Sequence, residues 1–268
     1  MVDNNKRLGG RYYDGPCIVI VGPTGSGKTG VAIEIAKELS GRAEIISADS
    51  RAIYKYMDIG TAKPSREERE EVVHFGLDLV EPGERFTVAD WKKMAEQKIV
   101  EIRNRGHVPM IVGGTGLYID ALVYNYKFIG KTGEKAPKDG SDEQKNCSDR
   151  QNNISNFIIF GIECKMDELR TRLKQRLNKL FVQELYDETS YLVEKYGWNN
   201  QAMKSNIYEY AWLYFEKGES LDEMKEKCLV RDYRLAKRQM TWFKRNKKII
   251  WLSLEKVKPS VLKCIQYG

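Results

Sequence analysis

A glycine-rich segment near the start of the chain has the residue types and spacing of a phosphate-binding loop. It reads Gly-Pro-Thr-Gly-Ser-Gly-Lys-Thr and matches the pattern G-x-x-x-x-G-K-[ST] at every position. The glycines let backbone N–H groups converge on phosphate oxygens, Lys28 adds a positive charge, and Thr29 is placed to bind Mg²⁺. The predicted phosphate site consists of Gly22, Pro23, Thr24, Gly25, Ser26, Gly27, Lys28 and Thr29.

Two other segments leave predicted strands at the same edge of the sheet. The run 44–48 ends at Asp49 and Ser50, and the run 108–112 ends in Gly-Gly-Thr-Gly at 113–116. Because open α/β sheets bind ligands at the carboxyl ends of their strands, we expect both segments beside the phosphate-binding loop. A carboxylate there could bind magnesium, act as a base toward an acceptor, or cap the next turn, and the residues alone leave these three roles open.

A third group of candidate residues lies on a helical pattern at 229–245. Apolar side chains recur there every three or four residues and should pack inward. The opposite stripe consists of Arg231, Arg234, Arg238, Thr241 and Arg245, with Lys237, Lys244, Lys247 and Lys248 nearby. Such a stripe is either a solvated helix face or a phosphate-binding surface, for which the bidentate guanidinium group is well suited.

The elements that must position these residues alternate along the chain. Short apolar runs, separated by helical stretches, predict buried parallel strands at 17–21, 44–48, 108–112, 157–162 and 249–252. Capping-box patterns that begin at Thr87 and Ser220 predict two helix starts. We therefore predict an α/β fold with a P-loop NTPase-like parallel sheet flanked by helices and a mainly helical C-terminal part.

The composition divides the chain into three parts. Residues 1–129 form the first part of the P-loop core, and residues 157–268 form its C-terminal part with the helical, basic segment. The stretch 130–156 between them is polar over most of its length, and we predict a surface loop because it cannot bury enough apolar surface to fold by itself.

Charge, residue counts and hydropathy indicate which partners, metal sites and cellular location to expect. The chain has 268 residues, a formal net charge of +7 and a pI of about 9.0, which favours a polyanionic partner. Only two histidines occur and the five cysteines are scattered, which argues against a Cys/His metal cluster. No apolar run could span a bilayer and no signal-peptide pattern opens the chain, so a cytoplasmic location is expected.

Several segments together resemble the tRNA dimethylallyltransferase family, also called isopentenyl-tRNA transferases. They occur in the family's order and extend over most of the chain. The matching stretches are GPTGSGKT at 22–29, ISADSRAIYKYMDIGTAKP at 46–64, LDLVEPGERFTVA at 77–89, GGTGLY at 113–118 and AKRQMTWF at 236–243.

The resemblance implies a prenyl transfer that needs Mg²⁺. The phosphate-binding loop would hold dimethylallyl diphosphate, and the amine of an adenosine beside the anticodon would attack the prenyl carbon. Asp49 would then be the general base that accepts the amine proton. Thr115 would lie beside it near the reacting groups, and Lys28 would stabilise the leaving diphosphate. The tRNA-binding residues would be Asp49, Ser50, Arg51, Ala52, Arg231, Arg234, Lys237, Arg238 and Gln239. A monomeric enzyme is expected.

The chain also departs from the family pattern. Ala52 stands where the family usually has glutamine, and Asp232-Tyr233 stands where it commonly has a Thr-Arg pair. The polar segment 130–156 replaces the helical insertion that grips the anticodon arm. Three other hypotheses therefore stay open: an adenylate isopentenyltransferase that uses AMP, ADP or ATP, a non-catalytic RNA-binding relative, and a P-loop kinase.

Overall fold

A computed structural model describes residues 12–128, 157–200, 202–204 and 206–267. The segment predicted as a polar loop, 130–156, lies outside these described residues. Within them, no helix combines the length and the apolar character that crossing a membrane requires.

The described strands form one parallel sheet in the order β3-β2-β4-β1-β5-β6. The strands are β1 (Cys17–Val21), β2 (Ala43–Ser47), β3 (His74–Phe75), β4 (Val108–Gly113), β5 (Phe157–Ile162) and β6 (Ile250–Leu252). The predicted parallel α/β core is therefore confirmed, with two strands starting one residue away from the prediction. Because β2, β4 and β1 are neighbours, the loops after them leave the sheet side by side.

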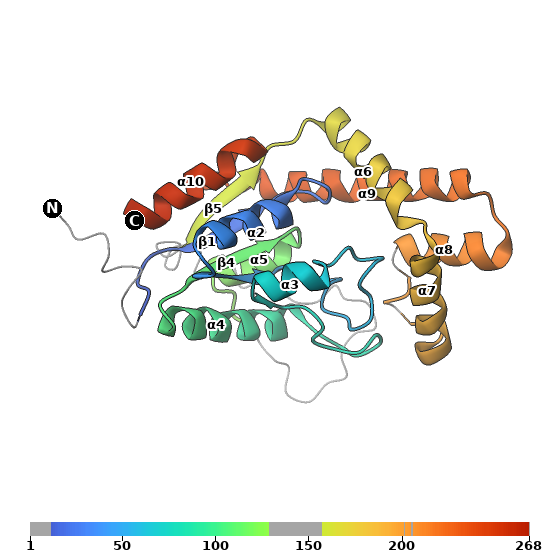
Figure 1. The fold of residues 1–268 in the computed structure, drawn as a ribbon, viewed down its shortest axis with the longest axis horizontal. Helices are drawn as coiled ribbons and strands as arrows, with labels where there is room; N and C mark the ends of the chain where they lie inside the picture. Colours follow the sequence, from blue (N-terminus) through green and yellow to red (C-terminus); the bar gives the residue numbers. More distant parts are fainter. Residues whose placement is uncertain (1–11, 129–156, 201, 205, 268) are drawn as a thin grey trace.

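Helices cover both faces of the sheet (Figure 1). One face packs against α2 (Lys28–Glu38) and α10 (Leu254–Tyr267), and the other packs against α4 (Val88–Asn104) and α5 (Gly116–Val123). Strand β1 is apolar throughout because its residues point alternately into the two hydrophobic clusters. Every one of them is buried.

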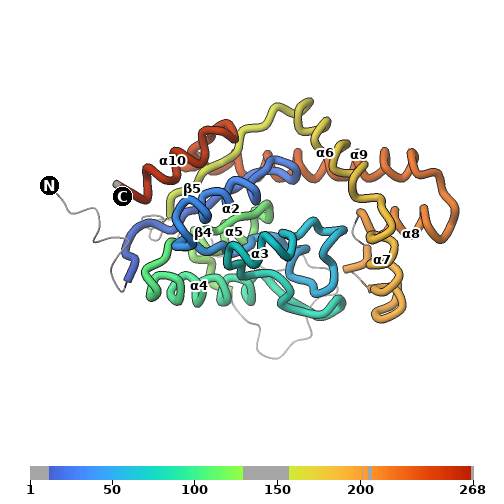
Figure 2. Tube along the Cα trace, in the orientation of Figure 1, coloured from blue at the N-terminus to red at the C-terminus, as the bar shows by residue number. Residues whose placement is uncertain are grey.

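A second group of helices forms a layer beside the sheet. It consists of α6 (Met166–Leu180), α7 (Gln183–Tyr196), α8 (Asn206–Lys217) and α9 (Leu221–Phe243). These helices share a third hydrophobic cluster, and Figure 2 shows α6 and α9 running next to one another. The last residue of α9, Phe243, packs in the sheet cluster instead, so α9 ties the helical layer to the core.

Both helix starts that were predicted from capping patterns are confirmed. Thr87 caps α4 in a full capping box with Asp90, as predicted. Ser220 caps α9 by accepting a hydrogen bond from the Glu223 backbone N–H. Among the helices that were not predicted individually are α3 (Arg66–Glu71) and the C-terminal α10, which contains Pro259.

Candidate active site

The phosphate-binding loop has the geometry of an anion site. Gly27 precedes α2 with a φ of +89°, a backbone conformation that favours glycine, and no side chain caps the helix. The N–H groups of the first helical turn therefore remain available to an anion. The hydroxyl of Ser26 is buried within the loop and has no hydrogen-bond partner among the described residues.

Lys28 is the charged group of this loop. Its Nζ donates to the Pro23 carbonyl at 3.0 Å, which folds the side chain back over the loop. Burial lowers the pKa of Lys28 to about 8, the Asp49 carboxylate opposes that shift, and the Arg176 guanidinium adds to it. An anion bound here would therefore favour the protonated lysine.

The loops after β2 and β4 hold Asp49 beside this site. The Ser50 N–H donates to the Thr115 hydroxyl oxygen at 3.0 Å, and the Thr115 N–H donates to the Ala48 carbonyl at 3.1 Å. The Asp49 Oδ1 accepts a hydrogen bond from the Arg51 N–H at 2.8 Å. Asp49 therefore does cap the next turn, but that contact uses only one of its two carboxylate oxygens.

Two helices of the helical layer complete the site from the opposite side. The Arg176 Nη1 on α6 donates to the Thr24 hydroxyl at 3.1 Å. On α9, Gln239 accepts from the Thr24 N–H at 2.8 Å and donates to the Gly114 carbonyl at 3.1 Å. Gln239 thus joins two loops. From the sequence it was predicted to bind tRNA.

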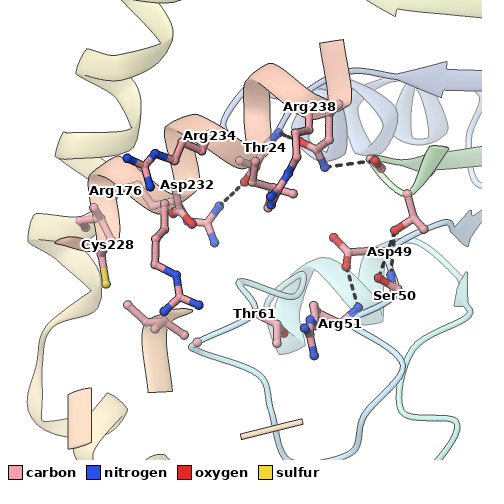
Figure 3. Close-up of a pocket in the computed structure, with 18 of the residues that line it drawn as sticks. Thr24, Asp49, Ser50, Arg51, Thr61, Arg176, Cys228, Asp232, Arg234 and Arg238 are labelled. Atoms are coloured by element: carbon pink, nitrogen blue, oxygen red, sulfur yellow. Dashed lines mark hydrogen bonds between the residues drawn. The ribbon is translucent and has the colours of Figure 1, made fainter. Parts of the chain in front are cut away.

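These walls enclose a cavity of about 660 Å³. Figure 3 shows Asp49 and Arg51 on one side of it and Arg176 and Arg234 on the other. The predicted site residues that line it are Thr24, Lys28, Asp49, Ser50, Arg51, Thr115, Arg231, Arg234, Arg238 and Gln239. Residues separated by some two hundred positions along the chain therefore line the same cavity.

A smaller cavity of about 170 Å³ adjoins the first. The two share Thr24, Lys28, Asp49, Thr61 and Arg176 as lining residues. The remaining predicted residues of the smaller cavity are Gly25, Gly27, Thr29 and Ala52. Lys28 and Asp49 therefore border both spaces, so a group bound in either one can reach them.

Some predicted residues lie outside both cavities or have other partners. Lys237 lines neither cavity, and its Nζ lies 4.7 Å from the centre of the Tyr233 ring. Arg231 lines the larger cavity but its Nη1 also forms an ion pair of 2.7 Å with Glu209, which offsets its charge. Gly22, Pro23 and Ser26 are not among the residues that line either cavity.

Sequence reasoning missed Arg176, Thr61 and Lys204, all of which line the larger cavity. Arg176 lies one residue before Leu177, on a helix whose buried residues are spaced four apart. That pattern predicts an amphipathic helix, but no sequence signal indicates that α6 packs against the phosphate-binding loop.

Comparisons with known proteins bear on the fold and the family of this chain. The family model described as IPP transferase matches residues 52–154 and 134–246, and the model described as isopentenyl transferase matches residues 16–78. A tRNA dimethylallyltransferase of Acetivibrio thermocellus is 37% identical over an alignment that covers 88% of this chain and 91% of the relative. That alignment spans 287 positions, more than the 268 residues of this chain, so the relative carries residues that this chain lacks.

Two further proteins extend the comparison. The tRNA dimethylallyltransferase of Bacillus subtilis is 31% identical, with 89% of this chain and 91% of the relative covered. The crystal structure of tRNA delta(2)-isopentenylpyrophosphate transferase from Staphylococcus epidermidis superposes with a TM-score of 0.78 at 31% identity, covering 94% of this chain and 99% of that one. With the phosphate-binding loop, the Asp49 turn and the family match on the same fold, the chain belongs to the tRNA dimethylallyltransferase family.

Proposed function

We propose that this protein transfers a dimethylallyl group from dimethylallyl diphosphate to the exocyclic amine of the adenosine next to the anticodon in tRNA, releasing diphosphate. The observation that carries the proposal is the pairing of a cationic phosphate-binding loop with a carboxylate, Lys28 with Asp49, at the junction of the two cavities. A phosphate site alone would fit many enzymes, whereas a neighbouring base is what a weakly nucleophilic aromatic amine needs.

The donor's diphosphate fits the phosphate-binding loop. Backbone N–H groups at the start of α2, the Lys28 ammonium and the Arg176 guanidinium converge there. Negative charge gathers on the diphosphate as the bond between its oxygen and the prenyl carbon breaks. Fixed donors and cations aimed at that charge stabilise the transition state more than the ground state.

The residues present also fit a Mg²⁺ ion bound with the donor. The described residues contain no cluster of three or more His, Cys, Asp or Glu side chains that could hold a metal alone. Mg²⁺ commonly uses one or two protein groups together with substrate phosphates and water, and the exposed Thr29 at the smaller cavity suits that arrangement. Bound there, the ion would neutralise diphosphate charge.

The acceptor adenosine would reach the reaction site from the larger cavity. The amine nitrogen forms a bond to the prenyl carbon, the electron pair of the broken carbon–oxygen bond leaves with diphosphate, and Asp49 accepts the amine proton. Thr115 supports this step indirectly, because its hydroxyl oxygen holds the Ser50 N–H and thereby the turn that carries Asp49. The target base must be turned out of the anticodon loop to enter the cavity.

A run of cations, of which only Arg234 and Arg238 line the larger cavity, favours tRNA over a free nucleotide as the acceptor. We define the basic track as the exposed residues Arg234, Lys237, Arg238, Lys244, Arg245, Lys247 and Lys248. None of them forms an ion pair with a described acidic residue, and the chain has no Asp or Glu between Asp232 and Glu255. A free nucleotide could contact only the end that lines the cavity, whereas a phosphate backbone could use the whole track.

We also propose that the enzyme acts as a monomer in the cytoplasm. We further propose that residues 130–156 stand in place of the family's helical insertion, in keeping with an alignment of 287 positions in which this chain, with 268 residues, must carry gaps. Sedimentation of the purified protein would test the monomer, since a stable dimer at assay concentrations would contradict it.

An acceptor assay tests the proposed function. The enzyme is incubated with dimethylallyl diphosphate, Mg²⁺ and either unmodified tRNA or AMP, and prenylated adenosine is measured by mass spectrometry. Prenylated tRNA at a rate far above that of prenylated AMP is the expected result. Product from AMP alone would support the adenylate isopentenyltransferase instead, and no product with either acceptor would overturn both.

A further inference from the structure

Glu188 on α7 forms a hydrogen-bonded contact between the helical layer and the wall of the cavity. Its Oε2 accepts from the backbone N–H groups of Asp58 at 2.9 Å and Ile59 at 2.8 Å. Its Oε1 accepts from the Gly60 N–H at 3.0 Å and from the Tyr208 hydroxyl at 2.7 Å. One carboxylate therefore satisfies consecutive backbone donors of a loop more than a hundred residues away in the chain.

The loop that Glu188 holds forms part of the larger cavity. Gly60 and Thr61 line that cavity, and Thr61 also lines the smaller one. On the core side of the same loop, the fully buried Lys63 side chain donates to Asp58 at 2.8 Å and to Asp78 at 2.6 Å. The loop is thus held from the core by Lys63 and from the helical layer by Glu188.

Tyr208 on α8 donates a hydrogen bond to the Glu188 carboxylate and packs against Gly60. The residue is fully buried, and desolvation, with the Glu188 charge beside it, raises the pKa of its hydroxyl well above the usual value. The hydroxyl therefore remains a donor to Glu188 at any assay pH. A Cβ at Gly60 would lie 2.4 Å from the Tyr208 ring carbon Cζ, so only glycine lets the loop backbone approach this closely.

We propose that Glu188 is a positioning residue that sets affinity for the acceptor by fixing the loop 58–61 against the larger cavity. This inference rests on the proposed function, because it assigns the larger cavity to the acceptor. The backbone N–H groups and the Lys28 side chain that would hold the diphosphate belong to a different loop, 22–29, and of the loop 58–61 only Thr61 also lines the smaller cavity. Loss of the Glu188 contact should therefore weaken acceptor binding and leave donor binding almost unchanged.

The variant Glu188→Gln tests this directly, because it preserves size but turns an amide N–H₂ toward backbone N–H donors. We expect the KM for tRNA to rise by about tenfold or more and the KM for dimethylallyl diphosphate to change by less than about twofold. The matched control is Glu194→Gln, which changes an exposed carboxylate on the same helix. We expect both KM values of this control to stay at the wild-type level. Tyr208→Phe removes one of the donors and should give a smaller rise in the tRNA KM.

A role confined to folding stability would give a different result. A partly unfolded variant loses kcat per total protein, while the molecules that remain folded retain both KM values. Unchanged KM values for both substrates in Glu188→Gln, or equal rises in the two, would overturn the inference.

Hydrogen exchange tests the loop without requiring catalysis. The amides of residues 58–60 should be protected in the wild-type protein and in Glu194→Gln, and should lose protection in Glu188→Gln. If the wild-type protein fails to prenylate tRNA, the proposed function fails, and this measurement still decides whether Glu188 fixes the loop. Unchanged protection in Glu188→Gln would overturn the inference whatever the activity.

Discussion

The two walls of the larger cavity are built in different ways. The core wall consists of loops that directly follow β1, β2 and β4, and its Lys28 and Asp49 side chains are half-buried. The helical wall consists of side chains from α6 and α9, of which Arg234 and Arg238 are exposed. Groups fixed by hydrogen bonds at strand ends suit chemistry, whereas exposed cations suit the capture of a polyanion. Changes in the core wall should therefore reduce turnover, and changes in the helical wall should reduce acceptor affinity.

The largest effect is expected from Asp49→Asn. Asparagine can still cap the turn through its side-chain oxygen but cannot accept the amine proton, so kcat should fall by about 10²-fold to 10⁴-fold. Binding of dimethylallyl diphosphate, measured by calorimetry, should match that of the wild type. The exposed Asp14→Asn serves as the control. A kcat within about threefold of the wild type would exclude Asp49 as the base.

A strong pH dependence is expected from Lys28. Burial lowers its pKa to about 8, so the cation is present below that pH and is lost as the pH rises through it. The kcat/KM for dimethylallyl diphosphate, which reports the free enzyme, should fall by about tenfold per pH unit well above this value. Lys28→Arg retains its charge and should show no such decline between about pH 7 and about pH 9.5. A flat wild-type profile would contradict a role for the Lys28 charge in donor binding.

A moderate effect is expected in the helical wall. The double variant Arg234→Ala and Arg238→Ala should raise the KM for tRNA by about tenfold with kcat nearly unchanged. The slope of log K against log salt for tRNA binding should become shallower by about 1.5. An equal loss of kcat and kcat/KM would mean that these arginines stabilise the transition state. The assignment of turnover to the core wall and acceptor affinity to the helical wall would then be wrong.

The smallest effect is expected at the far end of the basic track. Lys247→Ala with Lys248→Ala should weaken tRNA binding by about threefold at moderate salt and leave the rate with AMP unchanged. Lys227→Ala, an exposed lysine near the start of α9, is the matched control for charge. If the double variant bound tRNA with wild-type affinity, the acceptor would contact the cavity and not the far end of the basic track.

The core wall was largely predictable from local sequence. The loop at 22–29, the Asp49 turn and the segment 113–116 all follow short buried runs, and parallel strands bring their carboxyl ends to one edge. The helical wall was predictable only in part. The arginine stripe on α9 was identified, but its contact with the cavity could not be assigned, because periodicity gives the face of a helix and not its neighbour.

The sequence by itself determined the phosphate-binding loop, the parallel core and the family, because each depends on short patterns in which a residue's neighbours along the chain decide its structure. Only the tertiary structure showed that Arg176 reaches Thr24, that Gln239 joins two loops, and that Glu188 holds the loop 58–60. These contacts join segments more than a hundred residues apart, and the packing of α6, α7 and α9 against the core sets them. Polar side chains on such helices look like ordinary solvated residues until the partner surface is known.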